Sequence, residues 1–225
     1  MVDLDALVND PRWLPWSGWF DDRIKSIAEW IRKGQSGEWS GRKCAELNMC
    51  AIQQHSSEFK AFAKILEKAG INGKCLQLGL GNPGASHFVW HHLFDKAWTL
   101  DNNAYLGELG VPPIEVYLCR VPEHKDELLN FDSHSHQAVE IASNLGPFDF
   151  LFIDTDHSYH NVKDEYIKYS PLVRKGGIIA FHDTVFHQEY GPGFTVWQFM
   201  NELKDRGAQL HTIGIELGIS YLFKE

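Results

Sequence analysis

The feature that most constrains the fold of this chain is a regular alternation, from Cys75 onward, of short apolar runs with longer amphipathic stretches. The short apolar runs indicate buried strands, and the stretches between them carry apolar residues at the three- and four-residue spacing of helices. Strands that alternate with helices in this way are typical of βαβ units, in which the strands lie parallel in one sheet. The sequence therefore predicts an α/β fold with a doubly wound, Rossmann-like sheet.

Seven strands are predicted, and most of them belong to the parallel part of the sheet. The expected strands are 75–78, 97–100, a poorly defined strand before Asp132, 148–153, 177–181, 210–215 and 219–223. Glu216-Leu217-Gly218 joins the last two, which predicts a C-terminal antiparallel hairpin at the edge of the sheet. The segment 114–119 has an extended pattern, although the prolines around it favour an inserted loop.

Helices are predicted at 56–68, 86–94, 159–174 and after Thr195 as far as Gly207. In the helix at 159–174, Val162, Tyr166 and Ile167 are placed on one apolar face. Lys175-Gly176-Gly177 is interpreted as the turn that leads into the following strand.

Residues 1–53 are interpreted as an N-terminal helical arm or lid, separate from a main domain at 54–225. More than half of the chain's eight tryptophans lie in this arm: Trp13, Trp16, Trp19, Trp30 and Trp39. The stretch 21–33 carries apolar residues on one helical face. Two roles fit the tryptophans, lining a substrate pocket and plain packing, and packing is the favoured one.

Charge and composition exclude several kinds of partner. The formal charge of −9 and the absence of any Lys- or Arg-rich run argue against nucleic acid. No stretch approaches the ~20 consecutive apolar residues of a membrane span, and the acidic N-terminus lacks the pattern of a secretion signal. None of the four cysteines has CxxC spacing, which fits free thiols in a reducing cytoplasm. We expect a cytoplasmic protein, with a homo-oligomer as the default assembly.

A glycine-rich loop directly follows the first predicted strand. Residues 79–86 read GLGNPGAS, which fits the pattern G-x-G-x-x-G at the start of a helix. Glycines let the backbone turn sharply and approach a ligand, and a helix N-terminus favours polar or anionic groups. Asp101 ends the next strand, about 20 residues downstream, where an acid can bind ribose hydroxyls. These features predict a nucleoside-containing ligand without distinguishing a dinucleotide from S-adenosylmethionine.

Acids and histidines follow two later strands. Asp154, Asp156 and His157 come directly after 148–153, and His182-Asp183 follow 177–181. Ligands of open parallel sheets bind outside the carboxyl ends of the strands, so these side chains are predicted to surround one crevice. For Asp156 alone, a helix N-cap is the favoured interpretation. In the cluster as a whole, packed carboxylates repel each other unless a cation or a proton lies between them.

Two segments that carry these residues resemble a known family. Residues 148–166 (FDFLFIDTDHSYHNVKDEY) and 172–184 (LVRKGGIIAFHDT) are similar to class I methyltransferases of the group with sugar and macrolide O-methyltransferases and cephalosporin-hydroxylase-like proteins. The family pattern is an apolar strand ending in IDGDHSY, a helix, a turn ending in GG and a strand ending in FHD. Thr155 stands where the family usually has Gly. The resemblance extends from about Gln54 to the C-terminus.

The resemblance implies S-adenosylmethionine as the cofactor and assigns residues to it. Gly79, Gly81 and Ser86 would line its methionine and ribose portion, and Asp101 would hold the ribose. Gln77 occupies a position where relatives commonly have Glu, and its amide can still accept a hydrogen bond.

The family's GDS turn, which lies beside the adenine, corresponds to Asp132 and Ser133, although Phe131 stands where Gly is usual. Asp154, at the end of the strand 148–153, is also placed among the residues that contact the cofactor.

The resemblance also implies candidates for metal binding and catalysis. In metal-dependent relatives, the acid ending the fourth strand and a pair ending the fifth bind a divalent cation, usually magnesium. The matching residues are Asp154, His182 and Asp183. A His is a softer ligand than the acid or amide found in those relatives, which leaves metal dependence open. His157 falls where related catechol-type enzymes place a catalytic lysine, and a pKa near neutrality suits a general base.

The function expected from these residues is transfer of a methyl group from S-adenosylmethionine to a hydroxyl of a small acceptor, such as a sugar or natural product. Asp154 and His157 are the catalytic candidates. A non-catalytic module that binds S-adenosylmethionine is the first alternative, and an NAD-dependent oxidoreductase is a weaker one. The other histidines, including His91-His92 and His134 with His136, are interpreted as surface or packing residues rather than ligands.

Overall fold

The computed structural model describes residues 2–8, 56–81, 84–103, 113–118, 121–185, 193–214 and 217–225. The tryptophan-rich part of the predicted N-terminal arm lies outside these residues. In the predicted C-terminal hairpin, residues 215 and 216 also lie outside the described residues.

Helices and strands alternate through most of the described chain, as the apolar pattern predicts. The helices are α1 (Leu4–Val8), α4 (Ser56–Lys68), α5 (Ala85–Leu93), α6 (Pro113–Leu118), α7 (His136–Leu145), α8 (Tyr159–Tyr169) and α9 (Val196–Asp205), with the 3-10 helices η2 (Pro122–Glu127) and η3 (Ser170–Leu172). The strands are β1 (Lys74–Leu78), β2 (Lys96–Asp101), β3 (Leu128–Asn130), β4 (Phe148–Ile153), β5 (Val173–Phe181), β6 (His211–Ile213) and β7 (Ile219–Phe223).

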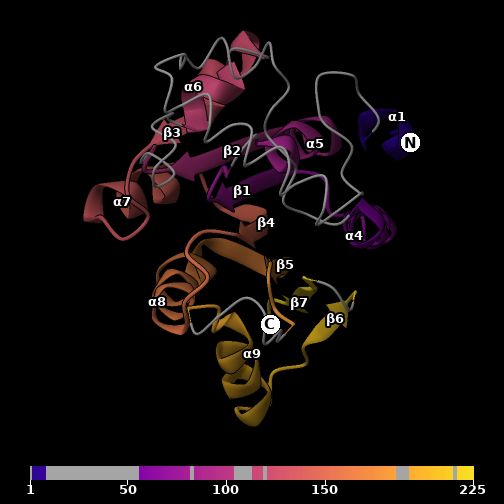
Figure 1. Cartoon of the computed structure of the whole chain (residues 1–225), viewed down its shortest axis with the longest axis vertical. Coiled ribbons are helices and arrows are strands. Elements are labelled where there is room, and N and C mark those ends of the chain that lie inside the picture. Colours follow the sequence, from indigo (N-terminus) through magenta and orange to yellow (C-terminus); the bar gives the residue numbers. More distant parts are fainter. Residues whose placement is uncertain are drawn as a thin grey trace, which may run out of the picture.

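The seven strands form one sheet in the order β3-β2-β1-β4-β5-β7-β6 (Figure 1). The pairs from β3 to β5 are parallel, whereas β7 pairs antiparallel with both β5 and β6. This arrangement confirms the predicted Rossmann-like sheet and its C-terminal antiparallel strands. The strand order reverses direction between β1 and β4, which makes that boundary the topological switch point of the sheet.

Two hydrophobic clusters cover the two faces of the sheet, so the fold has three layers (Figure 1). Residues of α4, α5 and α6 pack on one face, and residues of α7, α8 and α9 pack on the other. Alternate residues of β5 supply both clusters: Ile178 and Ala180 belong to the first, and Ile179 and Phe181 to the second. Burial of an Ile or Phe side chain contributes about 1.5–3 kcal/mol to folding. This packing on both faces holds the ends of the strands in fixed positions.

The segment 114–119, which has an extended pattern, is helical where the structure describes it. Pro113 begins α6, a position at which its missing N–H costs nothing. Ile114 and Tyr117 lie three residues apart and are both buried in the first cluster. Tertiary packing of these two side chains therefore outweighs the β preference of the local sequence.

The region 159–177 differs from its prediction in two respects. The helix α8 ends at Tyr169, and Ile167 is 59% exposed rather than part of the apolar face. The strand β5 already begins at Val173, so Lys175-Gly176-Gly177 lie inside the strand and not in a turn before it. The register shift between Phe148 and Phe150 of β4 marks the irregularity that accommodates them. Gly176 takes a φ of 75°, which glycine tolerates best.

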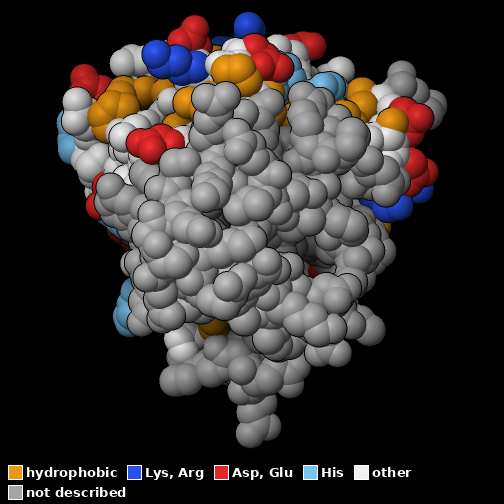
Figure 2. Space-filling model, turned by 45° about the horizontal axis from the view of Figure 1, so that its top comes forward, with side chains coloured by type: hydrophobic (Ala, Val, Ile, Leu, Met, Phe, Trp, Pro, Cys, Tyr) orange, Lys and Arg blue, Asp and Glu red, His pale blue; other side chains and the backbone are white. Residues whose placement is uncertain are grey.

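The described side chains along the upper rim of Figure 2 mix Lys and Arg with Asp, Glu and hydrophobic groups. Among the described helices, none combines the length and apolar character that crossing a membrane requires.

Candidate functional site

The candidate site lies at the switch point, outside the carboxyl ends of β1 and β4. The N–H of Asp154 donates to the carbonyl of Leu78 at 2.9 Å, and the N–H of Gly79 donates to the carbonyl of Leu100 at 2.8 Å. These two hydrogen bonds continue the sheet by one residue beyond the strands. The glycine loop after β1 and the acidic loop after β4 are therefore held side by side.

Gly79 is required at this position by the close approach of the two loops. Its φ is +85°, and a Cβ added to it would lie 2.0 Å from the carbonyl oxygen of Asp154. Gly81 and Gly84 also have positive φ values, 60° and 84°. The loop thus reaches α5 through conformations that favour glycine, as the G-x-G-x-x-G pattern predicts.

The buried side chains of Gln77 and Ser86 support the glycine loop. The amide nitrogen Nε2 of Gln77 donates to the carbonyl of Gly79 at 2.5 Å and to Ser86 Oγ at 2.9 Å. Its oxygen Oε1 is buried without a hydrogen-bond partner. A buried amide oxygen of this kind is satisfied by a donor that a ligand can bring.

The carboxylate of Asp101 joins the glycine loop to the end of β2. Its Oδ2 accepts from the N–H of Leu80 at 2.8 Å, and its Oδ1 accepts from the N–H of Asn103 at 2.7 Å. A carboxylate has about four acceptor positions, so it can still accept hydrogen bonds from ribose hydroxyls. Asp101 is thus placed beside the glycine loop, where the sequence predicts it.

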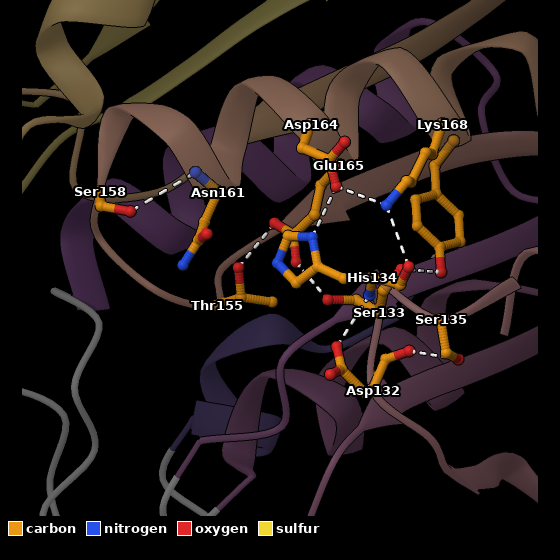
Figure 3. Close-up of polar contacts among 11 residues, drawn as sticks. Asp132, Ser133, His134, Ser135, Thr155, Ser158, Asn161, Asp164, Glu165 and Lys168 are labelled. Carbon is orange, nitrogen blue, oxygen red and sulfur yellow. Dashed lines mark hydrogen bonds and ion pairs between the residues drawn. The ribbon is translucent and has the colours of Figure 1, made fainter.

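The predicted adenine turn is held by a buried carboxylate of α8 (Figure 3). The hydroxyl of Ser133 donates to Glu165 Oε1 at 2.6 Å, and the hydroxyl of Thr155 donates to Glu165 Oε2 at 2.6 Å. Asp132 is exposed, and its Oδ1 accepts from the N–H of His134 at 2.8 Å. Glu165 therefore ties the turn after β3 to the loop after β4.

Burial raises the pKa of Glu165, although the two hydroxyl donors oppose that rise. Sequence reasoning missed this residue, but a signal was present. Val162, Glu165 and Tyr169 lie on the buried face of α8, so an acid occupies an otherwise apolar stripe.

The acids and histidines after β4 and β5 form one cluster, as the sequence predicts. Asp183 Oδ2 lies 2.9 Å from His157 Nε2 and 3.0 Å from His182 Nδ1. Asp154 Oδ1 lies 3.3 Å from the same His182 Nδ1. His182 is buried, so its ring lies between two carboxylates within the protein interior.

The charges in this cluster compensate each other. Burial lowers the pKa of His182, but the carboxylates of Asp183 and Asp154 outweigh it and hold that pKa well above its usual value. Burial also lowers the pKa of His157, and the hydrogen bond and charge of Asp183 reverse that effect. The two histidines in turn hold the pKa of Asp183 well below its usual value despite its burial.

Asp183 has a backbone conformation that non-glycine residues seldom adopt, with a φ of 55°. The left-handed conformation turns the chain directly after β5. A strained residue of this kind persists only where its surroundings over-determine it, and such residues concentrate at functional sites.

Magnesium fits this set of donors poorly. One atom from each of Asp154, His182 and Asp183 lies within 4.8 Å of the other two, which suits a metal ion by spacing. Magnesium, however, favours octahedral oxygen ligands, and one of these three donors is an imidazole nitrogen. The imidazole of His182 already lies between the carboxylates and supplies the positive charge that they require. The residues present therefore do not match magnesium.

His157 is oriented by contacts on three sides. Its ring stacks on that of Phe194, with 4.5 Å between centroids, and its Nε2 faces Asp183. Its carbonyl accepts from the N–H of Thr195 at 2.7 Å, which fastens it to the start of α9. With Nε2–H donating to Asp183, the Nδ1 atom of His157 is the nitrogen left to accept a proton. Phe194 carried no recognisable signal in the sequence.

Asp156 is not the N-cap of α8, which corrects the interpretation favoured for it. That position belongs to Ser158, whose hydroxyl accepts from the N–H of Asn161 at 3.4 Å. Asp156 instead accepts from the N–H of Ser158 at 2.8 Å and shapes the loop before the helix.

Tyr159 and Lys163 have the Tyr-x-x-x-Lys spacing of some NAD-dependent oxidoreductases. The NAD-dependent alternative was disfavoured partly because such a pair was taken to be absent, and that interpretation is wrong. Lys163 Nζ lies 2.8 Å from Tyr159 Oη and 2.9 Å from Glu202 Oε1. Tyr159 Oη also donates to Glu202, which lies on α9. Both groups are thus engaged in joining α8 to α9, which favours a structural role.

Residues 114–184 match a family model described as a methyltransferase domain. The matched residues run from α6 to Thr184 and include the turn after β3, Glu165 and the acid–histidine cluster. This match confirms the resemblance to methyltransferases that the two sequence segments indicate.

Solved methyltransferase structures share the fold. A proposed caffeoyl-CoA O-methyltransferase from Staphylococcus aureus is 15% identical, with a TM-score of 0.60 over 90% of this chain and 100% of that chain. MycE from the mycinamycin biosynthetic pathway, solved with Mg, SAH and mycinamycin VI, is 18% identical, with a TM-score of 0.53 over 93% of this chain and 64% of that chain. An O-methyltransferase from Bacillus cereus, solved with SAH, is 14% identical, with a TM-score of 0.53 over 89% of this chain and 91% of that chain. These similarities establish the fold.

One curated relative is closer in sequence. The chain is 36% identical over 179 residues to y4gI, an uncharacterised protein of Sinorhizobium fredii. The match covers 77% of this chain and 17% of that protein. The chain therefore spans about a sixth of the length of the curated relative that it matches.

Proposed function

We propose that this protein is an S-adenosylmethionine-dependent methyltransferase that methylates a hydroxyl of a small molecule. The observation that carries the proposal is the position of the glycine loop and Asp101 beside the His157–Asp183 pair at the switch point. The first two suit a nucleoside-containing cofactor, and the pair suits removal of a proton. The match of residues 114–184 to a methyltransferase-domain model and the SAH-bound structures of the same fold support this cofactor.

The reaction is an in-line displacement in which the cofactor supplies an activated methyl group. The acceptor oxygen forms a bond to the methyl carbon as the bond between that carbon and sulfur breaks, and the sulfur keeps the electron pair. Nδ1 of His157 takes the acceptor's proton. Asp183 holds the ring orientation through Nε2 and stabilises the imidazolium that results.

The remaining predicted residues position the cofactor. Gly79, Gly81 and Ser86 would line its methionine and ribose portion, and Asp101 would hold the ribose hydroxyls. The turn at Asp132 and Ser133 would contact the adenine, with Glu165 fixing the position of the turn. We assign no step to magnesium, because the donors present do not match that ion.

The main domain is proposed to extend over 54–225, with residues 1–53 as an N-terminal helical arm or lid. The formal charge of −9 favours a small molecule over nucleic acid.

Calorimetric titration of the purified protein with S-adenosylhomocysteine, with and without magnesium, tests the cofactor assignment. We expect binding under both conditions with the same affinity. Absence of binding under both conditions would contradict the proposed function, and binding only with magnesium would contradict the argument against that ion.

Replacing His157 with Ala tests the assignment of the base. Turnover is expected to fall by roughly 10²–10⁴-fold, because proton removal by a positioned side chain contributes about that much. The measurement is formation of S-adenosylhomocysteine with a panel of sugars, catechols and macrolides as acceptors. Binding of S-adenosylhomocysteine should be retained.

The matched control is His160→Ala, which removes an exposed imidazole three residues away on α8. Its turnover should equal that of the unmodified protein. A His157→Ala variant with full turnover would exclude His157 as the base. Binding without methylation of any acceptor by the unmodified protein would favour the non-catalytic alternative.

A further inference from the structure

A second group of histidines, distinct from the acid–histidine cluster, lies where α5 and η2 meet. His87 and His91 lie one turn apart on α5, and His124 and Glu127 lie three residues apart on η2. The carboxylate of Glu127 is common to their contacts. Its Oε2 lies 3.2 Å from His87 Nε2 and 2.8 Å from His91 Nδ1. His124 Nδ1 lies 3.9 Å from the same oxygen.

His87 has an unsatisfied ring nitrogen that faces this carboxylate. The side chain has no exposure to solvent, and its Nε2 has no hydrogen-bond partner. Its other nitrogen, Nδ1, lies 2.9 Å from Thr99 Oγ1, and a threonine hydroxyl can accept the proton of Nδ1. Nε2 then carries a lone pair that faces the acceptor oxygen of Glu127. A cation between the two atoms would satisfy both of them.

His124 is also buried. The ring of His91 stacks on that of His124 at 3.7 Å between centroids, and Tyr117 Oη lies 2.7 Å from His124 Nδ1.

We propose that His87, His124 and Glu127 bind one zinc ion. One donor atom from each of them lies within 4.8 Å of the other two. In a tetrahedral zinc site with bonds of about 2.0–2.1 Å, neighbouring donors lie about 3.3 Å apart. His87 Nε2 lies 3.2 Å from Glu127 Oε2, which is close to this value. His124 Nδ1 lies 3.9 Å from the same oxygen and would exchange its contact with Tyr117 Oη for the ion. A water molecule completes the four ligands.

Zinc is favoured over magnesium or calcium because two of the three protein donors are imidazole nitrogens. His91 is a positioning residue, since its Nδ1 contacts both carboxylate oxygens of Glu127, at 2.9 and 2.8 Å. Partners of this kind orient the groups that bind the metal.

The ion would fasten two elements that flank the candidate cofactor site. α5 follows the glycine loop, and η2 leads into β3, which precedes the turn at Asp132 and Ser133. A bond from His87 to His124 through zinc fixes the first element relative to the second. This role does not depend on which reaction the protein catalyses.

Titration of the metal-free full-length protein with Co²⁺ and then Zn²⁺ tests the proposal. Co²⁺ in a tetrahedral site gives strong visible absorption, which Zn²⁺ abolishes when it takes the same site. We expect the absorption in the unmodified protein and its loss in Glu127→Gln and His124→Ala. His92→Ala is the matched control, because His92 neighbours His91 on α5 but its Nδ1 contacts the carbonyl of Phe88. Circular dichroism establishes that each variant is folded.

The variant Asp154→Asn separates this site from the acid–histidine cluster, and it should keep the absorption. Loss of the absorption in that variant, or its persistence in both Glu127→Gln and His124→Ala, would overturn the proposal. Failure of the unmodified protein to bind Co²⁺ or Zn²⁺ would overturn it as well. If the two ligand variants do not fold, His91→Gln, which retains all three ligands, should weaken Zn²⁺ binding by about 10–100-fold. Unchanged binding in His91→Gln would then count against the site.

Discussion

Glu165 is a carboxylate of α8 that lies buried and is held by hydroxyl groups. Its side chain has no solvent exposure, and its two oxygens accept from Ser133 and Thr155. Removing it would leave both hydroxyls without their acceptor, and Ser133 is buried. Each such loss costs about 1–3 kcal/mol, so Glu165→Ala should destabilise the protein by at least that amount.

The pH dependence of stability distinguishes the charge of Glu165 from its packing. Burial raises the pKa of Glu165 in the folded protein above its unfolded value of 4.5. The protonated form is therefore favoured by folding, and this contribution is complete below about pH 4.5 and is lost as the pH rises through the folded pKa. Glu165→Gln cannot ionise and should gain stability relative to the unmodified protein over that pH window.

Urea unfolding of both proteins at several pH values measures this difference. Glu140→Gln on α7 serves as the control, because Glu140 is exposed. A difference between Glu165→Gln and the unmodified protein that does not change with pH would refute the assignment of a raised pKa.

At the residue scale, the sequence predicts the side chains that follow strands and misses those that approach from helices. Asp154, His182 and Asp183 could be placed together because the ends of parallel strands meet at one edge. Glu165 could not, since its contact with Ser133 depends on how α8 packs over the turn after β3. Gln77 was expected to contact the cofactor, but its amide also holds the glycine loop. Only the three-dimensional path of that loop reveals this second role.

At the element scale, the loops after β1 and β4 act as one unit, because Gly79 lies directly against the backbone of Asp154. Gly79→Ala would combine the cost of a left-handed alanine, about 1–2 kcal/mol, with a steric clash that costs about 1–3 kcal/mol more. The loop must then move away from β4. We expect lower stability together with loss of S-adenosylhomocysteine binding, measured by thermal unfolding and calorimetry.

Gly70→Ala is a close control for this substitution. Gly70 has a φ of +69°, but nothing lies within 4 Å of a Cβ added there. This variant should therefore show the conformational cost alone, with cofactor binding intact. Equal destabilisation of the two variants would show that the close approach of the loops adds no steric cost to the free energy of unfolding.

The predicted bounds are most accurate for the elements that are most deeply buried. The strand at 148–153 is found with the predicted bounds, because its residues are apolar and lie in the centre of the sheet. The start of β5 was placed too late, since Gly176 and Gly177 signal a turn while their backbone hydrogen bonds to Lys224 keep them in the strand. The helix α6 was missed because Ile114 and Tyr117 pack at helical spacing in spite of their β preference.

At the scale of the whole molecule, the candidate site lies above two hydrophobic clusters that pack against opposite faces of one sheet. The strands β1 and β4 contribute to both clusters, and the loops at their ends form the site. The two loops lie together only in the folded state, so a ligand that contacts both of them binds the folded state and not the unfolded chain. Its binding therefore stabilises the whole domain and not just the loops.

Thermal unfolding should therefore distinguish residues needed for cofactor binding from residues needed only for catalysis. S-adenosylhomocysteine at 100 times its Kd stabilises the folded state by about 2.7 kcal/mol, which corresponds to a rise in Tm of about 5–11 °C for a chain of this size. His157→Ala should show the full rise, because the role proposed for His157 is on the acceptor. Gly79→Ala should show none, because its loop no longer fits the cofactor. If His157→Ala also lost the rise, His157 would belong to the cofactor site, and the general base would have to be another residue.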